Sequence, residues 1–138
     1  AGRGRFHELA GHPAARVRCG AFVLLAAGAP LDEVHEQVVA SLDKRVSVET
    51  LGAVGVIETK EAVAAVLAAD AAAKAANVHL IETKTVVGGG KGYVTLCGAV
   101  GDVRAAVAAA VAAVKKDLLV GHVVIPQADP QLLAMVGK

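Results

Sequence analysis

Hydrophobic and polar positions alternate along the chain in a pattern that predicts strands and helices in regular succession after residue 50. Residues 52–58 are apolar and β-branched, which predicts a strand, and the alanine-rich residues 60–76 show the spacing of a helix. Two more strands are expected over residues 78–87 and 93–100, and the glycine-rich turn between them predicts that they pair as a hairpin.

A second helix, a strand and a short helix complete this pattern. We expect a helix over residues 101–116 that is capped by Asp102, a strand over 118–125, and a last helix over 130–136 that starts at a proline. The order strand, helix, strand, strand, helix, strand is the split βαβ arrangement. The sequence therefore predicts an α+β, ferredoxin-like fold in which two main helices cover one face of a four-stranded antiparallel sheet.

The first third of the chain differs in composition, and we predict two regions. Residues 1–49 form an N-terminal extension or part of a first domain, and residues 50–138 form the main domain. Within the extension, residues 31–42 carry apolar positions at helical spacing and residues 21–25 resemble a strand. Because it has few large apolar groups, we expect the extension to dock on the main domain or on a neighbouring subunit.

Composition and charge narrow the classes of function. The 138 residues are 55% hydrophobic but only 2% aromatic, so the core is expected to consist of alanine, valine and leucine. Fourteen basic and thirteen acidic residues leave a formal net charge of +1. With no basic stripe and almost no aromatic residues to stack on bases, the chain is not expected to bind nucleic acid.

Neither a membrane span nor a disulfide framework is predicted. The longest charge-free run, residues 19–31, is too short to cross a bilayer, so we expect no membrane partner; a signal peptide is the other interpretation of this run. Cys19 and Cys97 lie far apart and outside any metal-binding spacing, which favours a reducing, cytoplasmic location.

The first predicted main helix is rich in small residues. Beyond Asp70 and Lys74, an acid and a base four residues apart, its alanines are expected to leave a surface of low polarity. Apolar surface of this kind usually marks a partner interface, so we expect the chain to form oligomers. The alanines concerned are Ala64, Ala65, Ala68, Ala72 and Ala73.

The segment that joins the two strands of the predicted hairpin consists of Gly88, Gly89, Gly90, Lys91 and Gly92. Glycine tolerates positive φ and lets backbones approach closely, so this segment can crowd around an axis or a ligand. A nucleotide site is disfavoured, because the GxxxxGK[ST] pattern is missing and a strand rather than a helix follows. The plainer interpretation is a hairpin connection with a solvated lysine.

No arrangement of residue types predicts catalysis or metal binding. Glu58, Glu82 and Asp102 could supply acid–base chemistry, but nothing in the sequence singles them out for it, and no nucleophile stands beside a base. The histidines lack the spacing of metal ligands, apart from two that flank a proline-bearing turn, so structural or surface positions are expected for His7, His12, His35, His79 and His122. We therefore expect no enzyme, no catalytic residue, no metal and no cofactor.

Several segments of the main domain, taken together, are similar to the bacterial microcompartment shell-protein domain. The run LGAVGVIETK at residues 51–60 resembles the opening strand of that family, and ADAAAKAANV at 69–78 resembles its first helix and the exit from it. The glycine segment lies where the family has its pore loop, Gly101-Asp102-Val103 resembles the start of the second helix, and residues 123–126 resemble the last strand. The resemblance covers roughly residues 50–136.

The resemblance implies a structural tile of a microcompartment shell in the cytoplasm. Six such domains would form a hexamer with the pore loops at its centre, and tiles would join edge to edge, together with other shell proteins, around encapsulated enzymes. It assigns to the tile edge Asp70, Lys74, Asn77, Pro126 and Gln127, with Lys74 packed against its symmetry mate. The run Gln127-Ala128-Asp129 departs from the family's usual Arg-Pro-His, so the resemblance implies that one edge contact is missing.

Two alternatives to the homohexamer stay open. The length of the glycine segment, and Lys91 within it, are closer to the second half of tandem-domain shell proteins, which form pseudohexameric trimers. Some tandem members hold an iron–sulfur cluster at the pore through cysteine, and since this segment has no cysteine we expect no cluster there. A PII-like regulatory module that binds a small ligand shares the fold plan, but the short loops favour the tile.

Overall fold

The computed structural model of the chain describes residues 34–136. From β1 onward the elements follow the predicted order of strand, helix, strand, strand, helix, strand, and a short helix ends the described part. The strands are β1 (Ala53–Thr59), β2 (His79–Val87), β3 (Lys91–Gly98) and β4 (Leu119–Ile125). The helices are α3 (Glu36–Asp43), α4 (Ala62–Ala75), α5 (Val100–Ala113) and α6 (Pro130–Val136), with the 3₁₀ turns η2 (Gly88–Gly90) and η3 (Lys116–Leu118).

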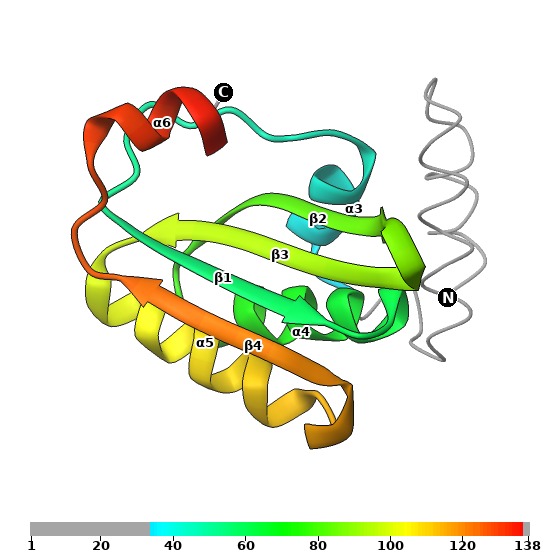
Figure 1. The fold of residues 1–138 in the computed structure, drawn as a ribbon. Helices are drawn as coiled ribbons and strands as arrows, with labels where there is room; N and C mark the ends of the chain where they lie inside the picture. Colours follow the sequence, from blue (N-terminus) through cyan, green and yellow to red (C-terminus); the bar gives the residue numbers. More distant parts are fainter. Residues whose placement is uncertain (1–33, 137–138) are drawn as a thin grey trace.

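The four strands form one antiparallel sheet in the order β2-β3-β1-β4. Figure 1 shows α4 and α5 side by side on one face of this sheet, while α6 lies over the opposite face. The predicted α+β fold, with a split βαβ order and two main helices on one face, is confirmed.

The layer between the sheet and the two main helices is the larger core, and small residues bring its elements close together. Gly55 of β1 is one example, because a Cβ built on it would lie 2.7 Å from the Val107 side chain of α5. Ile57, Leu80 and Leu96 project from the strands into this layer and are fully buried. Large strand residues therefore meet alanine and valine on the helices, which fills the core without aromatic side chains.

The interpretation of the α4 alanines as an exposed partner surface is wrong. All five are buried, because α4 is enclosed by the sheet, by α5 and by α3. Alanine at these positions lets several elements pack on one helix. The exposed large apolar residue of α4 is instead Leu67, at 37%. The buried residues are Ala64, Ala65, Ala68, Ala72 and Ala73.

The two ends of α5 also differ from the prediction. The helix begins at Val100 after Ala99, which makes no side-chain cap, so Asp102 is not the capping residue. Asp102 lies in the first turn, where its negative charge still meets the positive end of the helix dipole. At the other end the helix stops at Ala113, and Lys116 begins η3.

The segment that precedes β1 packs along β2 and covers its outer edge. Gln37 of α3 contacts the backbone of this edge twice: its Nε2 donates to the Val78 carbonyl at 3.1 Å, and its Oε1 accepts from the Leu80 N–H at 3.0 Å. Further along, the N–H of Val46 donates to the Ile81 carbonyl at 2.7 Å. The first half of β2 is thereby closed to any additional strand.

Helix α3 corresponds to the predicted helix over residues 31–42, and its start is set by His35. The Nδ1 atom of His35 accepts from the Gln37 N–H at 3.1 Å and caps the helix. The predicted strand at residues 21–25 lies outside the described residues. Among the helices of residues 34–136, none combines the length and the apolar character needed to cross a membrane.

Candidate functional site

The glycine segment forms the connection between β2 and β3, and its tip exposes the main chain. Gly89 and Gly90 have φ angles of +81° and +80°, a left-handed conformation that residues with a side chain rarely adopt. A Cβ on either residue would meet nothing within 4 Å, and both residues are exposed together with Lys91. The tip therefore exposes the backbone groups of Gly89 and Gly90 and the ammonium group of Lys91 to solvent or to a neighbouring molecule.

Gly92 at the end of this segment has a different role, because it is buried. A Cβ there would collide with α4 and lie 3.0 Å from the Lys84 carbonyl oxygen. Thr59 Oγ1 is 2.7 Å from the Glu61 carbonyl and 3.3 Å from the Gly92 carbonyl, so its hydroxyl bridges the end of β1 and the start of β3. The base of the hairpin is thus held against the core while its tip stays exposed.

Three of the predicted tile-edge residues lie at the other end of the sheet. Antiparallel pairing sets the starts of β1 and β2 beside the ends of β3 and β4, away from the glycine segment. Asn77 lies two residues before this end of β2, whereas Pro126 and Gln127 directly follow this end of β4, and all three are exposed. Because β2 and β4 are the outer strands, these residues stand at opposite corners of the same end.

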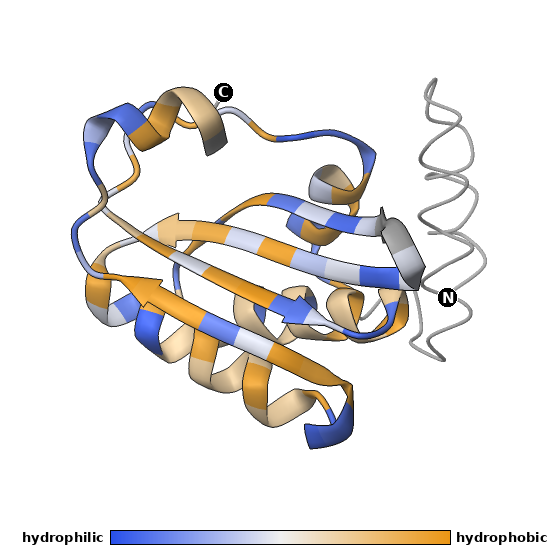
Figure 2. Cartoon of the chain, in the orientation of Figure 1, coloured by the Kyte–Doolittle hydropathy of each residue, from blue (hydrophilic) through white to orange (hydrophobic). Residues whose placement is uncertain are grey.

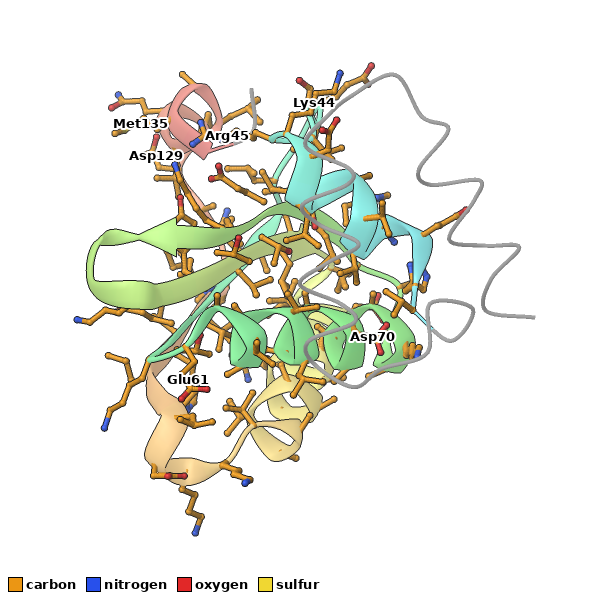
Figure 3. All side chains as sticks on the ribbon, turned by 90° about the vertical axis from the view of Figure 1, so that its right-hand side faces the viewer. Lys44, Arg45, Glu61, Asp70, Asp129 and Met135 are labelled. Atoms are coloured by element: carbon orange, nitrogen blue, oxygen red, sulfur yellow. The ribbon has the colours of Figure 1, made fainter. Side chains whose placement is uncertain are left out.

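Asp70 and Lys74 of α4 form the ion pair that their spacing predicts, with 2.8 Å between Lys74 Nζ and Asp70 Oδ2. The Lys74 side chain is 47% exposed and that of Asp70 only 21%. The other carboxylate oxygen of Asp70 accepts from the His35 N–H at 2.9 Å, directly ahead of α3 (Figure 3). Asp70 therefore anchors α3 within the chain, and Lys74 is the member of the pair that faces outward.

A cluster of polar side chains lies on the α6 side of the sheet, and the sequence analysis did not predict that these residues contact one another. The Tyr93 hydroxyl donates to Glu82 Oε2 at 2.9 Å, and Arg45 Nη2 donates to the same oxygen at 3.3 Å. Arg45 Nη1 also donates to the Met135 carbonyl at 2.7 Å, which ties α6 to the segment before β1. Burial first, and then the hydrogen bond to Glu82 and its negative charge, raise the pKa of Tyr93.

Only the strand pairing behind this cluster could have been found in the sequence. The predicted hairpin sets residues 82 and 93 on facing strands, but their position on one face of the sheet depends on the register shift between Lys84 and Val87, which the sequence pattern does not show. The contribution of Arg45 has no such signal, because it comes from an irregular segment.

The histidines and cysteines of the described part are not gathered into a site. Within residues 34–136, no group of three histidine, cysteine, aspartate or glutamate residues is placed to hold a metal ion. His35 caps α3, and His79 and His122 are exposed. Cys97 is buried, and this burial raises the pKa of its thiol. His7, His12 and Cys19 lie outside the described residues.

A four-stranded antiparallel sheet backed by two helices, with an exposed glycine tip at one end, defines the class as a small α+β domain with a split βαβ order. The sequence pattern of the BMC domain family matches residues 53–128, which is more than half of the chain. The chain therefore belongs to the BMC domain family, as the resemblance indicated.

Two known proteins are similar to this chain. The bacterial microcompartment shell protein PduT of Citrobacter freundii is 40% identical over 99 residues, which cover 70% of this chain and 54% of PduT. A crystal structure of a microcompartment protein from Desulfitobacterium hafniense DCB superimposes with a TM-score of 0.67 and 40% identity, covering 72% of this chain and 56% of that one. The chain thus spans about half the length of each relative.

Proposed function

We propose that this chain is a structural unit of a bacterial microcompartment shell, which assembles with copies of itself and with other shell proteins around enclosed enzymes. The observation that carries the proposal is that the glycine tip lies at one end of the sheet, while three predicted edge residues, Asn77, Pro126 and Gln127, lie at the other. In a flat ring, one end of each unit faces the axis and the other faces the neighbouring rings. The shell protein PduT, a relative of this chain, supports the same role.

In this proposal six glycine tips converge on the axis of a homohexamer and line a pore. The N–H groups of Gly89 and Gly90 and the ammonium group of Lys91 then favour the passage of anionic or polar metabolites over apolar ones. Glycine suits this position because the two residues adopt positive φ and carry no side chain that would narrow the opening. The role is structural and selective rather than catalytic.

The outer edge of β4 supports lateral assembly. Val120 and Val123 of this strand are 44% and 50% exposed, and β4 is hydrophobic along most of its length (Figure 2). An exposed apolar edge strand has unpaired backbone N–H and C=O groups, which can pair with a strand of another chain. Gln37 and Val46 cover the first half of the opposite edge, at β2, so within residues 34–136 β4 is the outer strand whose edge is open along its whole length.

A trimer of two-domain subunits with pseudo-sixfold symmetry is the second candidate. The length of the relatives favours it, because this chain spans only 54% of PduT and 56% of the Desulfitobacterium protein. In that arrangement residues 50–138 are one unit of the ring and residues 1–49 belong to a preceding unit. The glycine tip and the tile edge keep the same roles in both candidates.

Electron microscopy of the purified chain tests the proposal, using Lys74→Ala as the informative variant. The wild-type chain should form hexagonal arrays, and Lys74→Ala should keep its oligomeric mass but form no sheets, because the lysine acts at the tile edge. Lys115→Ala removes an exposed lysine outside the predicted edge and should leave the arrays unchanged. Arrays of normal extent in Lys74→Ala would contradict the edge role.

A further inference from the structure

A cavity of about 330 Å³ opens on the sheet face that carries α6, beside the part of that face that α6 covers. Its volume is at the lower end of the range of small-molecule sites, about 300–1,000 Å³. One lining residue comes from the segment before β1 and the others from β1, β2 and β3: Arg45, Val56, Glu58, Glu82, Tyr93 and Thr95. The cavity includes none of the pore-loop or tile-edge residues, so it is a separate site.

Strand register arranges the lining residues in two adjacent rows. Thr95 pairs with Glu82 on one side and with Val56 on the other, and in the next row Tyr93 pairs with Glu58. Directly opposite residues have Cβ atoms about 4.5–5.5 Å apart. The Glu58 carboxylate, the Tyr93 ring and the Thr95 hydroxyl therefore border the same small volume.

The two carboxylates of the cavity differ in their partners. Glu82 accepts hydrogen bonds from Tyr93 and Arg45, so its charge is compensated. The Glu58 main chain is paired within the sheet, but its half-buried side chain forms no hydrogen bond or ion pair within residues 34–136. Lys84, a further cation on this face, pairs with Tyr93 from β2, which puts it two strand spacings from Glu58, about 10 Å.

We propose that this cavity binds a small organic cation with a single ammonium group. The ammonium group donates to the Glu58 carboxylate and lies beside the Tyr93 ring, which attracts cations through its π-system. The alkyl part contacts Val56, and the Thr95 hydroxyl is available to a second polar group. An anion is disfavoured, because Arg45 is already engaged by Glu82 and by the Met135 carbonyl.

The test uses the full chain, n-butylammonium chloride as probe, and tyrosine fluorescence as readout. Tyr93 is the sole tyrosine of a chain that has no tryptophan, so the signal comes from the cavity itself. Glu58→Gln keeps the size of the side chain and removes its charge. Its matched control is Glu61→Gln, an exposed glutamate at the start of α4 on the helix side of the sheet (Figure 3). Calorimetry measures the same affinities without the fluorophore.

Wild type and Glu61→Gln should bind the probe with equal dissociation constants. Glu58→Gln should raise that constant about tenfold or more, the effect expected from losing one charge-assisted hydrogen bond. In the wild type, the uncharged isostere 1-butanol should bind about tenfold more weakly than the probe, and this comparison needs no folded variant. No binding of butylammonium, equal binding of butylammonium and butanol, or an unchanged constant in folded Glu58→Gln would overturn the proposal. The result does not depend on shell assembly.

Discussion

Gly92 of β3 lies directly against Ala65 of α4: a Cβ added to Gly92 would stand 2.6 Å from the Cβ of Ala65. Non-bonded carbon atoms prefer a separation of about 3.5–4.0 Å, so only glycine allows the hairpin to rest on the helix at this point. The contact joins the base of the glycine segment to the core of the domain.

Replacing Gly92 with alanine should therefore lower the free energy of unfolding by about 1–3 kcal/mol, the usual effect of adding a methyl group to a packed core. Gly101→Ala is the control, because a Cβ there meets nothing within 4 Å. In the first turn of α5 it should stabilise the chain by up to about 1 kcal/mol, since alanine is the better helix former. Urea unfolding measures both, and equal effects of the two substitutions would refute the role of the contact.

Asp70 should contribute more to the free energy of unfolding than its partner Lys74. Asp70→Ala leaves the His35 N–H without its acceptor and should cost about 1–3 kcal/mol of stability, whereas Lys74→Ala removes only an exposed pair and should cost at most about 0.5 kcal/mol. Asp70→Asn keeps an acceptor oxygen and should recover most of the loss. If Lys74→Ala destabilised the chain as much as Asp70→Ala, the anchoring of α3 by Asp70 would be wrong.

The hydroxyl of Tyr93 should titrate above the ordinary tyrosine value of about 10, because its pKa is raised mainly by burial and then by Glu82. The ultraviolet absorbance of the phenolate reports this one group, since the chain has a single tyrosine. A raised pKa means that the folded chain holds the proton more tightly than the unfolded chain. The contribution to stability is thus complete below the unfolded pKa and is lost as the pH rises through the folded pKa.

Two variants separate the causes of this shift. Glu82→Gln should lower the midpoint towards the ordinary value without reaching it, because burial is the larger cause. Glu61→Gln, far from the hydroxyl, should leave the midpoint where it is. If the titration midpoint of Tyr93 in the wild type were at or below that of N-acetyltyrosinamide, the buried hydrogen bond from Tyr93 to Glu82 would be contradicted.

Reversal of charge at the glycine tip should change what passes through the proposed pore. In assemblies reconstituted in a planar bilayer, the wild type should conduct anions better than cations, and Lys91→Glu should shift this preference towards cations. Lys115→Glu makes the same charge change outside the tip and should have no such effect. An ion preference that Lys91→Glu leaves untouched would argue for a simple hairpin turn with a solvated lysine.

Local chemistry explains why most element boundaries could be predicted. Pro130 sets the start of α6 where it was expected, since proline suits the first turn of a helix. The apolar and β-branched residues likewise located β1 within one residue of its predicted bounds. The position of the glycine segment between paired strands also follows from local signals.

The burial of helix faces and the contacts between distant side chains depend on which elements pack together, and the sequence pattern does not show that packing. An alanine on α4 is compatible with a solvent-exposed face and with a buried one, and only the presence of α3 and α5 decides that Ala68 is buried. Arg45 meets Glu82 and Met135 from distant parts of the chain, so no spacing could indicate the contact.

A charge introduced on the open edge strand β4 should prevent oligomer formation without unfolding the chain. Val123→Lys places an ammonium group at a half-exposed position of that strand and should abolish oligomers while the circular dichroism spectrum stays unchanged. His79→Lys puts the same charge on β2, whose edge Gln37 covers, and should leave the oligomer intact. Oligomers of equal mass in both variants would mean that β4 is not part of the interface.

The mass of the purified wild-type chain under native conditions tests the central claim most directly. Convergence of the glycine tips on one axis requires a closed ring, so native mass spectrometry should find six copies, or three if the chain forms the trimer. A particle with the mass of a single chain at every concentration would contradict the account.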